Sequence, residues 1–316
     1  MVISLFISVA SFILLFIFIF CGNSYIPATK DAVLFFFENV FPTMFPFYVL
    51  SSVITSSAAL RKLSKPLKFM AKPFKLPAEA SCAIILGLLC GFPVGAKVTS
   101  DLLAGNCINK RQAAVLASFT NNVSPVFAVS IIGKLYFKNE FLGFLIWVCL
   151  SVSGLISGLI ISKIADKFDS LDNISYKKET KAVTAASATS ITDSVISGIN
   201  TSLYVGGVII FFSSITSLIK QIPFFSTKTY VFLYSFLEMT GGLKEFNHFL
   251  SNISMYTKLI AVMLISSWSG LCVHMQICGI LKSANIKTNY YFLSKIFQTL
   301  LCFIIGLILY LLLLRT

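Results

Sequence analysis

Residues 84–101 read I-I-L-G-L-L-C-G-F-P-V-G-A-K-V-T-S-D, an apolar run that is broken by Gly-Phe-Pro and then carries a lysine and an aspartate. A helix does not continue unbroken through Pro93, because proline lacks an N–H and its ring clashes with the preceding turn. Broken backbone at membrane depth survives only where protein or a water-filled cavity satisfies its polar groups. The stretch therefore predicts a re-entrant hairpin of two half-helices over residues 79–104.

The composition of the whole chain places this hairpin in a membrane protein. Hydrophobic residues make up 57% of the 316 positions and charged residues 12%, with a mean hydropathy of +0.88. Soluble domains carry about twice that charged share. The 31 phenylalanines lie mostly in long uncharged runs, which favours helices over a barrel of alternating strands. We therefore expect an all-α polytopic membrane protein.

The net charge of +13 has a plain explanation in such a protein. Lysine and arginine gather in the gaps between apolar runs, where they set topology and attract anionic lipid. No nucleic-acid-binding module is visible, so nucleic acid is not an expected partner. The eight cysteines are scattered, mostly within apolar runs, which indicates small buried hydrophobic residues rather than a disulfide framework.

Seven apolar runs are long enough to cross a hydrocarbon core of roughly 30 Å: 2–21, 32–58, 112–133, 140–162, 195–219, 259–281 and 293–314. A second re-entrant hairpin is expected over 229–250, where Gly241 and Gly242 interrupt the run. The order of span, hairpin, span and span then occurs twice, in opposite orientations. Inverted repeats with discontinuous helices are typical of secondary transporters, whose sites lie near the bilayer midplane.

This order divides the chain into four parts. They are an N-terminal transmembrane helix (1–30), a first repeat (31–162), a cytoplasmic linker (163–193) and a second repeat (194–316).

The first candidate site is the start of the second half-helix, near Pro93. Free N–H groups and the positive end of that helix would face a midplane cavity, with Lys97 one turn further on, and would suit a carboxylate or phosphate. The alternative is that Lys97 and Asp101, four residues apart, only neutralise each other. The candidate solute-binding residues here are Gly91, Phe92, Pro93, Gly95 and Lys97.

A second break is S-F-T-N-N-V-S-P-V-F at residues 118–127, inside an otherwise apolar span. Pro125 removes a helix hydrogen bond, so the helix should unwind there. Asn121, Asn122 and Ser124 would then line a polar pocket, because amides are costly in hydrocarbon. The alternative is that they make hydrogen bonds between helices that only stabilise packing.

In the second half the matching candidates are Glu238, Thr240, Ser267 and Ser269. Glu238 would take a coupling proton or cation, or else make a structural hydrogen bond. His274 lies between two cysteines, but helical geometry separates those cysteines, so no metal site and no cofactor are predicted. No catalytic motif of a known enzyme class is present, and we do not expect an enzyme.

Three motifs resemble the YlbJ family of sporulation integral membrane proteins. They are E-N-V-F-P-T-M-F-P-F (Glu38–Phe47), G-F-P-V-G-A-K (Gly91–Lys97) and S-F-T-N-N-V-S-P-V-F (Ser118–Phe127). That family belongs to the nucleoside-recognition Gate group, which is similar to concentrative nucleoside transporters. The resemblance implies two Gate-type repeats and a protein of a bacterial cell membrane. It also implies a role in endospore formation, with transport of dipicolinic acid across the outer forespore membrane.

The leading hypothesis is a secondary transporter or facilitator of a small anionic solute, with dipicolinic acid as the favoured substrate. The alternatives are a nucleoside or related heterocycle permease and a non-transporting membrane scaffold for spore-envelope assembly. The expected partners are the solute and membrane lipid. A coupling ion and a homo-oligomeric assembly are left open.

Topology gives the first test. The segment 61–75 holds six basic residues and no acidic one, which predicts a cytoplasmic loop at 59–77. The N-terminus should then be cytoplasmic and the C-terminus should lie on the opposite face. Accessibility labelling of cysteines introduced at Lys68 and Lys228 should report opposite sides. Labelling of both from one side would contradict the inverted arrangement.

Overall fold

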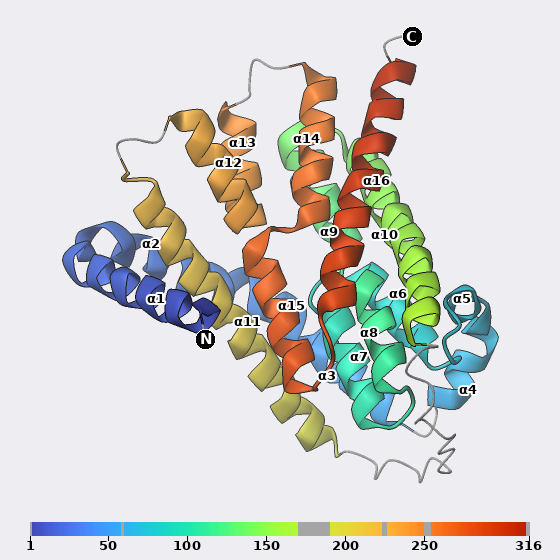
Figure 1. Cartoon of the computed structure of the whole chain (residues 1–316). Helices are drawn as coiled ribbons and strands as arrows, with labels where there is room; N and C mark the ends of the chain where they lie inside the picture. Colours follow the sequence, from blue (N-terminus) through green and yellow to red (C-terminus); the bar gives the residue numbers. More distant parts are fainter. Residues whose placement is uncertain (1, 58–59, 170–189, 223–225, 250–253, 314–316) are drawn as a thin grey trace.

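A computed structural model describes residues 2–57, 60–169, 190–222, 226–249 and 254–313 (Figure 1). Within these ranges the regular elements are all helices, which confirms the all-α prediction. Five helical runs in the described residues are long and apolar enough to cross a membrane: 22–56, 140–168, 191–219, 255–283 and 289–309.

The helices of the first half follow the expected order. They are α1 (Val2–Phe20), α2 (Gly22–Phe35), α3 (Phe41–Ser56), α4 (Leu60–Ser64), α5 (Lys68–Ala71), α6 (Ala80–Cys90), α7 (Val94–Ala104), α8 (Lys110–Phe119), α9 (Pro125–Phe127) and α10 (Glu140–Asp169). A π-helical turn, Phe36–Val40, joins α2 to α3, and a π-helical stretch, Ala128–Phe137, extends α9.

Six helices make up the described part of the second half. They are α11 (Ile191–Ile219), α12 (Thr227–Leu237), α13 (Met239–Phe249), α14 (Met255–Trp268), α15 (Gly270–Ser283) and α16 (Asn289–Leu313). The expected linker at 163–193 begins as a continuation of α10 to Asp169, and its residues 170–189 lie outside the described ranges.

Two differences from the expected spans have physical causes. The span expected at 32–58 is part of a longer helical run that starts at Gly22, so the expected boundary after residue 30 falls inside α2. This run lies antiparallel to α11, with Thr29 bound to Ser214 at 2.7 Å. The span expected at 112–133 is divided into α8 and the α9 segment, because residues 120–124 are not helical. Each piece alone is too short to cross a bilayer.

At the position of each expected hairpin the structure has a pair of packed helices. Helices α6 and α7 are joined through residues 91–93, and α12 and α13 are joined at Glu238. Figure 1 shows α12 and α13 side by side at the upper left, and α7 and α8 at the lower right. The depth of these hairpins in the membrane and the inversion of the two halves stay predictions.

Helix α8 supports the first hairpin through an unusually close contact. A Cβ built on Gly87 of α6 would lie 2.1 Å from the carbonyl oxygen of Thr120, and one on Gly95 of α7 would lie 2.0 Å from it. The hairpin can therefore approach the end of α8 only because both positions lack a side chain.

This contact predicts a strong effect of one methyl group. Gly87→Ala would push the hairpin away from the Thr120 carbonyl and should lower the stability by about 1–3 kcal/mol, as overpacking does. Thermal unfolding of the protein in detergent would measure the loss. The control is Gly207→Ala in α11, where a Cβ meets nothing within 4 Å. Equal behaviour of the two variants would contradict the packing argument.

Candidate functional site

The tip of the first hairpin packs on the unwound segment between α8 and α9. The Phe92 N–H donates to the carbonyl oxygen of Asn122 at 2.8 Å. Gly91 has a φ of +78°, and a Cβ there would lie 2.8 Å from the backbone nitrogen of Ser124. The break near Pro93 and the break near Asn121, which the sequence predicted separately, are therefore in contact and form one buried structure.

Asn121 connects two helix ends within this structure. Its Oδ1 accepts from the Ala96 N–H in the first turn of α7 at 2.8 Å, and its Nδ2 donates to the carbonyl of Ala117 in α8 at 2.9 Å. The side chain is 1% exposed. Because a helix begins with unpaired N–H groups and ends with unpaired carbonyls, one amide satisfies both kinds of group.

The neighbouring polar residues hold the segment in different ways. Asn122 donates through Nδ2 to the carbonyl of Phe119 at 2.8 Å, and its Oδ1 accepts from Gln298 Nε2 of α16 at 2.7 Å. The Ser124 hydroxyl oxygen caps α9 by accepting from the Phe127 N–H at 3.2 Å. Both Asn121 and Asn122 therefore face protein, as both interpretations of the sequence required.

Lys97 lies one turn into α7, with a side chain that is 6% exposed. Its Nζ is 2.6 Å from both carboxylate oxygens of Asp101. This is the neutral pair that the sequence offered as the alternative. A contact between Lys97 and a solute stays a prediction.

The second hairpin repeats the arrangement with different groups. The two carboxylate oxygens of Glu238 accept from the N–H groups of Thr240 at 2.8 Å and Gly241 at 2.5 Å, so this side chain caps α13. Gly270 begins α15 with a φ of +77°, and a Cβ there would lie 2.9 Å from the Met239 nitrogen. The tip at residues 237–239 therefore packs on the break between α14 and α15.

Of the two candidate serines of the second half, Ser269 forms that break and Ser267 lies in the last turn of α14. Ser269 is fully buried with a φ of 72°, and its hydroxyl donates to the carbonyl of Ser266 at 3.1 Å. Ser267 is also fully buried, and its hydroxyl donates to the carbonyl of Leu264 at 2.9 Å. The backbone carbonyl of Ser267 is left for a partner from another helix.

Lys295 of α16 joins the two breaks, and sequence reasoning did not identify it. Its Nζ donates to the carbonyl of Asn121 at 2.8 Å and reaches the carbonyl of Ser267 at 3.5 Å. It also donates to Gln298 Oε1 at 3.1 Å, and Lys295 is 1% exposed. The available signal was a lysine and a glutamine three residues apart, on one face of an otherwise apolar helix.

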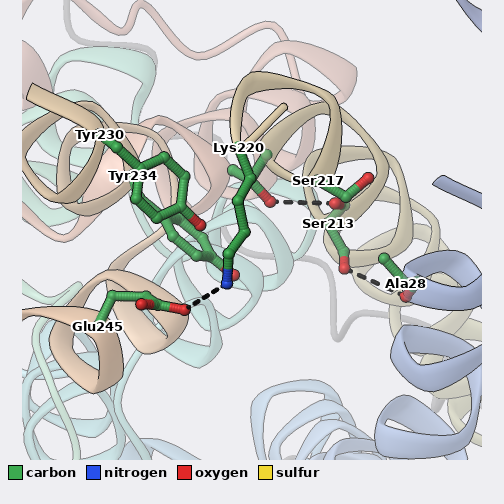
Figure 2. Close-up of a pocket in the computed structure, with 8 residues that line it drawn as sticks. Ala28, Ser213, Ser217, Lys220, Tyr230, Tyr234 and Glu245 are labelled. Atoms are coloured by element: carbon green, nitrogen blue, oxygen red, sulfur yellow. Dashed lines mark hydrogen bonds and ion pairs between the residues drawn. The ribbon is translucent and has the colours of Figure 1, made fainter. Parts of the chain in front are cut away.

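A cavity of about 180 Å³ lies beside the second hairpin (Figure 2). Lys220 and Glu245 pair across it at 3.2 Å, and none of the predicted site residues lines it. The Tyr234 hydroxyl on its wall lies beside Gly241, where a Cβ would be 2.2 Å away. One wall residue of the cavity, Tyr234, therefore reaches the first turn of α13. Its lining residues are Ala28, Ser213, Thr216, Ser217, Lys220, Tyr230, Tyr234 and Glu245.

Comparison with known proteins agrees with the motifs. Residues 37–138 match the family model described as Gate, nucleoside recognition. The chain is 27% identical over 303 residues to the sporulation integral membrane protein YlbJ of Bacillus subtilis (strain 168), which covers 86% of this chain and 74% of that protein. No solved structure matches the chain. The resemblance drawn from the three motifs is confirmed. The Gate match includes the first hairpin and the Asn121 break, and it ends before α10.

The capping role of Glu238 gives a test. Glu238→Gln keeps one acceptor oxygen but turns an NH₂ group toward a backbone N–H, which should cost about 1–3 kcal/mol of stability. Thermal unfolding in detergent would measure the loss. The matched control is Glu140→Gln, since Glu140 is 61% exposed and lies 3.5 Å from Lys134. An unchanged melting temperature for Glu238→Gln would contradict the cap.

Proposed function

We propose that this chain is a membrane transporter or facilitator of a small anionic solute, and that the solute is dipicolinate during endospore formation. The observation that carries the proposal is the pair of broken helices, each covered by the tip of a hairpin and joined to the other through Lys295. Discontinuous helices that meet in the interior are the parts from which secondary transporters build solute sites.

The preference for an anion comes from a difference between the two hairpin tips. At the start of α13 the chain supplies its own carboxylate, Glu238, which binds two N–H groups. The first turn of α7 has no acidic residue, and the group that binds its Ala96 N–H is the neutral amide of Asn121. A helix N-terminus without a carboxylate favours an anion from solution.

Access to this helix end requires movement. Val94 and Ala96 are fully buried, and the Phe92 N–H is bound to the Asn122 carbonyl. A solute would reach the tip when the first hairpin moves away from the unwound segment. The proposed solute-binding groups are then those of residues 91–97, Asn121, Asn122 and Ser124, with the second tip and Ser267 and Ser269 facing them.

The cellular context of the proposal comes from the relative. Its name describes an integral membrane protein of sporulation, and its similarity extends over most of the chain. Dipicolinate is a small planar dianion that the resemblance connects with transport across the outer forespore membrane. We propose the same place and substrate for this chain, acting without enzymatic chemistry.

A nucleoside or related heterocycle is the second candidate. The Gate model is described as nucleoside recognition, and the amides of Asn121, Asn122 and Gln298 are groups that bind base edges. Uptake of labelled dipicolinate and labelled nucleosides into proteoliposomes would separate the two. We expect dipicolinate to enter and nucleosides to compete weakly. If neither dipicolinate nor nucleosides are taken up, the result would favour a non-transporting scaffold.

The role of Lys97 can be separated from its pairing with Asp101. Lys97→Met alone leaves a buried carboxylate, so the informative variant is Lys97→Met combined with Asp101→Asn, which removes both charges. If Lys97 contacts the solute, affinity measured in proteoliposomes should fall about ten- to a hundredfold in both variants. The exposed Lys282→Met serves as control. Normal uptake by the double variant would reject Lys97 as a binding group.

A further inference from the structure

We propose that the Lys295 ammonium is a fixed cation in the position where a secondary transporter would bind an exchangeable coupling cation. The inference rests on the proposed transport function and deepens it, because it concerns the driving force. Its consequence is that the solute crosses without a sodium gradient.

The oxygens around Lys295 are those of a cation site. Nζ has three oxygen neighbours, the carbonyls of Asn121 and Ser267 and the Oε1 of Gln298, at 2.8, 3.5 and 3.1 Å. All three are neutral, and among the ion pairs of the described residues none involves Lys295. Lys97 by contrast has the carboxylate of Asp101. Among the described residues, a protonated Lys295 is therefore balanced by dipoles alone.

One of these dipoles belongs to a helix end, and another belongs to the unwound backbone just beyond a helix. Asn121 lies two residues beyond Phe119, the last residue of α8, and Ser267 lies in the last turn of α14. The C-terminal end of a helix carries partial negative charge from its unpaired carbonyls. In transporters with broken helices, unwound carbonyls and the C-terminal ends of half-helices coordinate the coupling sodium ion or proton. Here one unwound carbonyl, that of Asn121, and one helix-end carbonyl, that of Ser267, converge on one ammonium.

A tethered charge differs from a bound ion in one respect. It cannot leave the site, so a sodium gradient cannot supply energy through its binding and release. It still holds the two breaks together, because Lys295 reaches the carbonyls of both Asn121 and Ser267. An ionisable side chain in the interior of a membrane protein is costly and usually functional, which agrees with this use.

The first test needs no transport assay. Lys295→Ala removes the ammonium and leaves its oxygen neighbours, so the vacated site should bind a small cation. In choline chloride the variant should unfold at a lower temperature than the wild type. Sodium or methylammonium at about ten times the dissociation constant should raise its melting temperature by roughly 2–5 °C. The wild type and the exposed control Lys287→Ala should not respond.

Each outcome of the melting experiment either supports or overturns the proposed cation site. A folded Lys295→Ala protein that no small cation stabilises would overturn the cation site and leave only a hydrogen-bonded link between helices. If sodium raises the melting temperature of the wild type above its value in choline at equal ionic strength, the wild type binds sodium. That result would overturn the proposal that the Lys295 ammonium takes the place of the ion. If Lys295→Ala does not accumulate, Lys295→Met replaces it, because methionine preserves the side-chain volume. The response of the wild-type melting temperature to sodium then still tests whether the wild type binds sodium.

The second test connects the site to transport. Wild-type proteoliposomes should take up labelled dipicolinate at the same rate in sodium, potassium or choline chloride, and Lys295→Met should lose at least tenfold in rate. A sodium requirement of the wild type, or normal uptake by Lys295→Met, would overturn the inference. Wild-type vesicles that move no dipicolinate would reject the proposed substrate, while the stability measurement would still decide the cation site.

Discussion

The structure depends on one constraint, the need of interrupted helices to satisfy the backbone groups that each break exposes. Asn121 meets it in the first half by binding the start of α7 and the end of α8 with one amide. Glu238 meets it in the second half by binding the first N–H groups of α13. Because these groups are buried, each break fixes the position of the hairpin that covers it. Glycines at 87, 95 and 270 allow the close approach that this requires.

Part of this could be predicted from the sequence. The breaks near Pro93 and Asn121 were identified because proline and amides are rare in apolar helices, and the structure places the two segments in contact. The helical class followed from composition. Lys295 and Gln298 were not identified, because an average over a span of more than twenty residues hides two polar positions. Their partners lie 174 and 176 residues away, a distance that no local pattern reports.

The two halves share an order of elements but not a charge distribution. The first tip pairs Lys97 with Asp101 inside one helix and leaves the start of α7 without a carboxylate. The second tip uses its carboxylate on its own backbone. If the halves derive from one ancestral unit, they differ in charge at positions where function, rather than folding, would have selected different residues. In the proposed function, this asymmetry is the reason to expect an anion at the first tip.

Lys295 adds a positive charge where the two halves meet, and its neighbours explain why it is tolerated there. Three oxygens around an ammonium recover part of the hydration that burial removes. One of them lies at the negative end of α14, and another lies in the unwound backbone just after α8. A carboxylate in the same place would neutralise the charge and make the link stronger than dipoles do. A link made from dipoles is weaker, so its carbonyls separate more easily in the hairpin movement that the proposed transport requires. A fixed charge with neutral partners therefore fits the proposed transport, in which the junction has to join the two halves and still allow them to move.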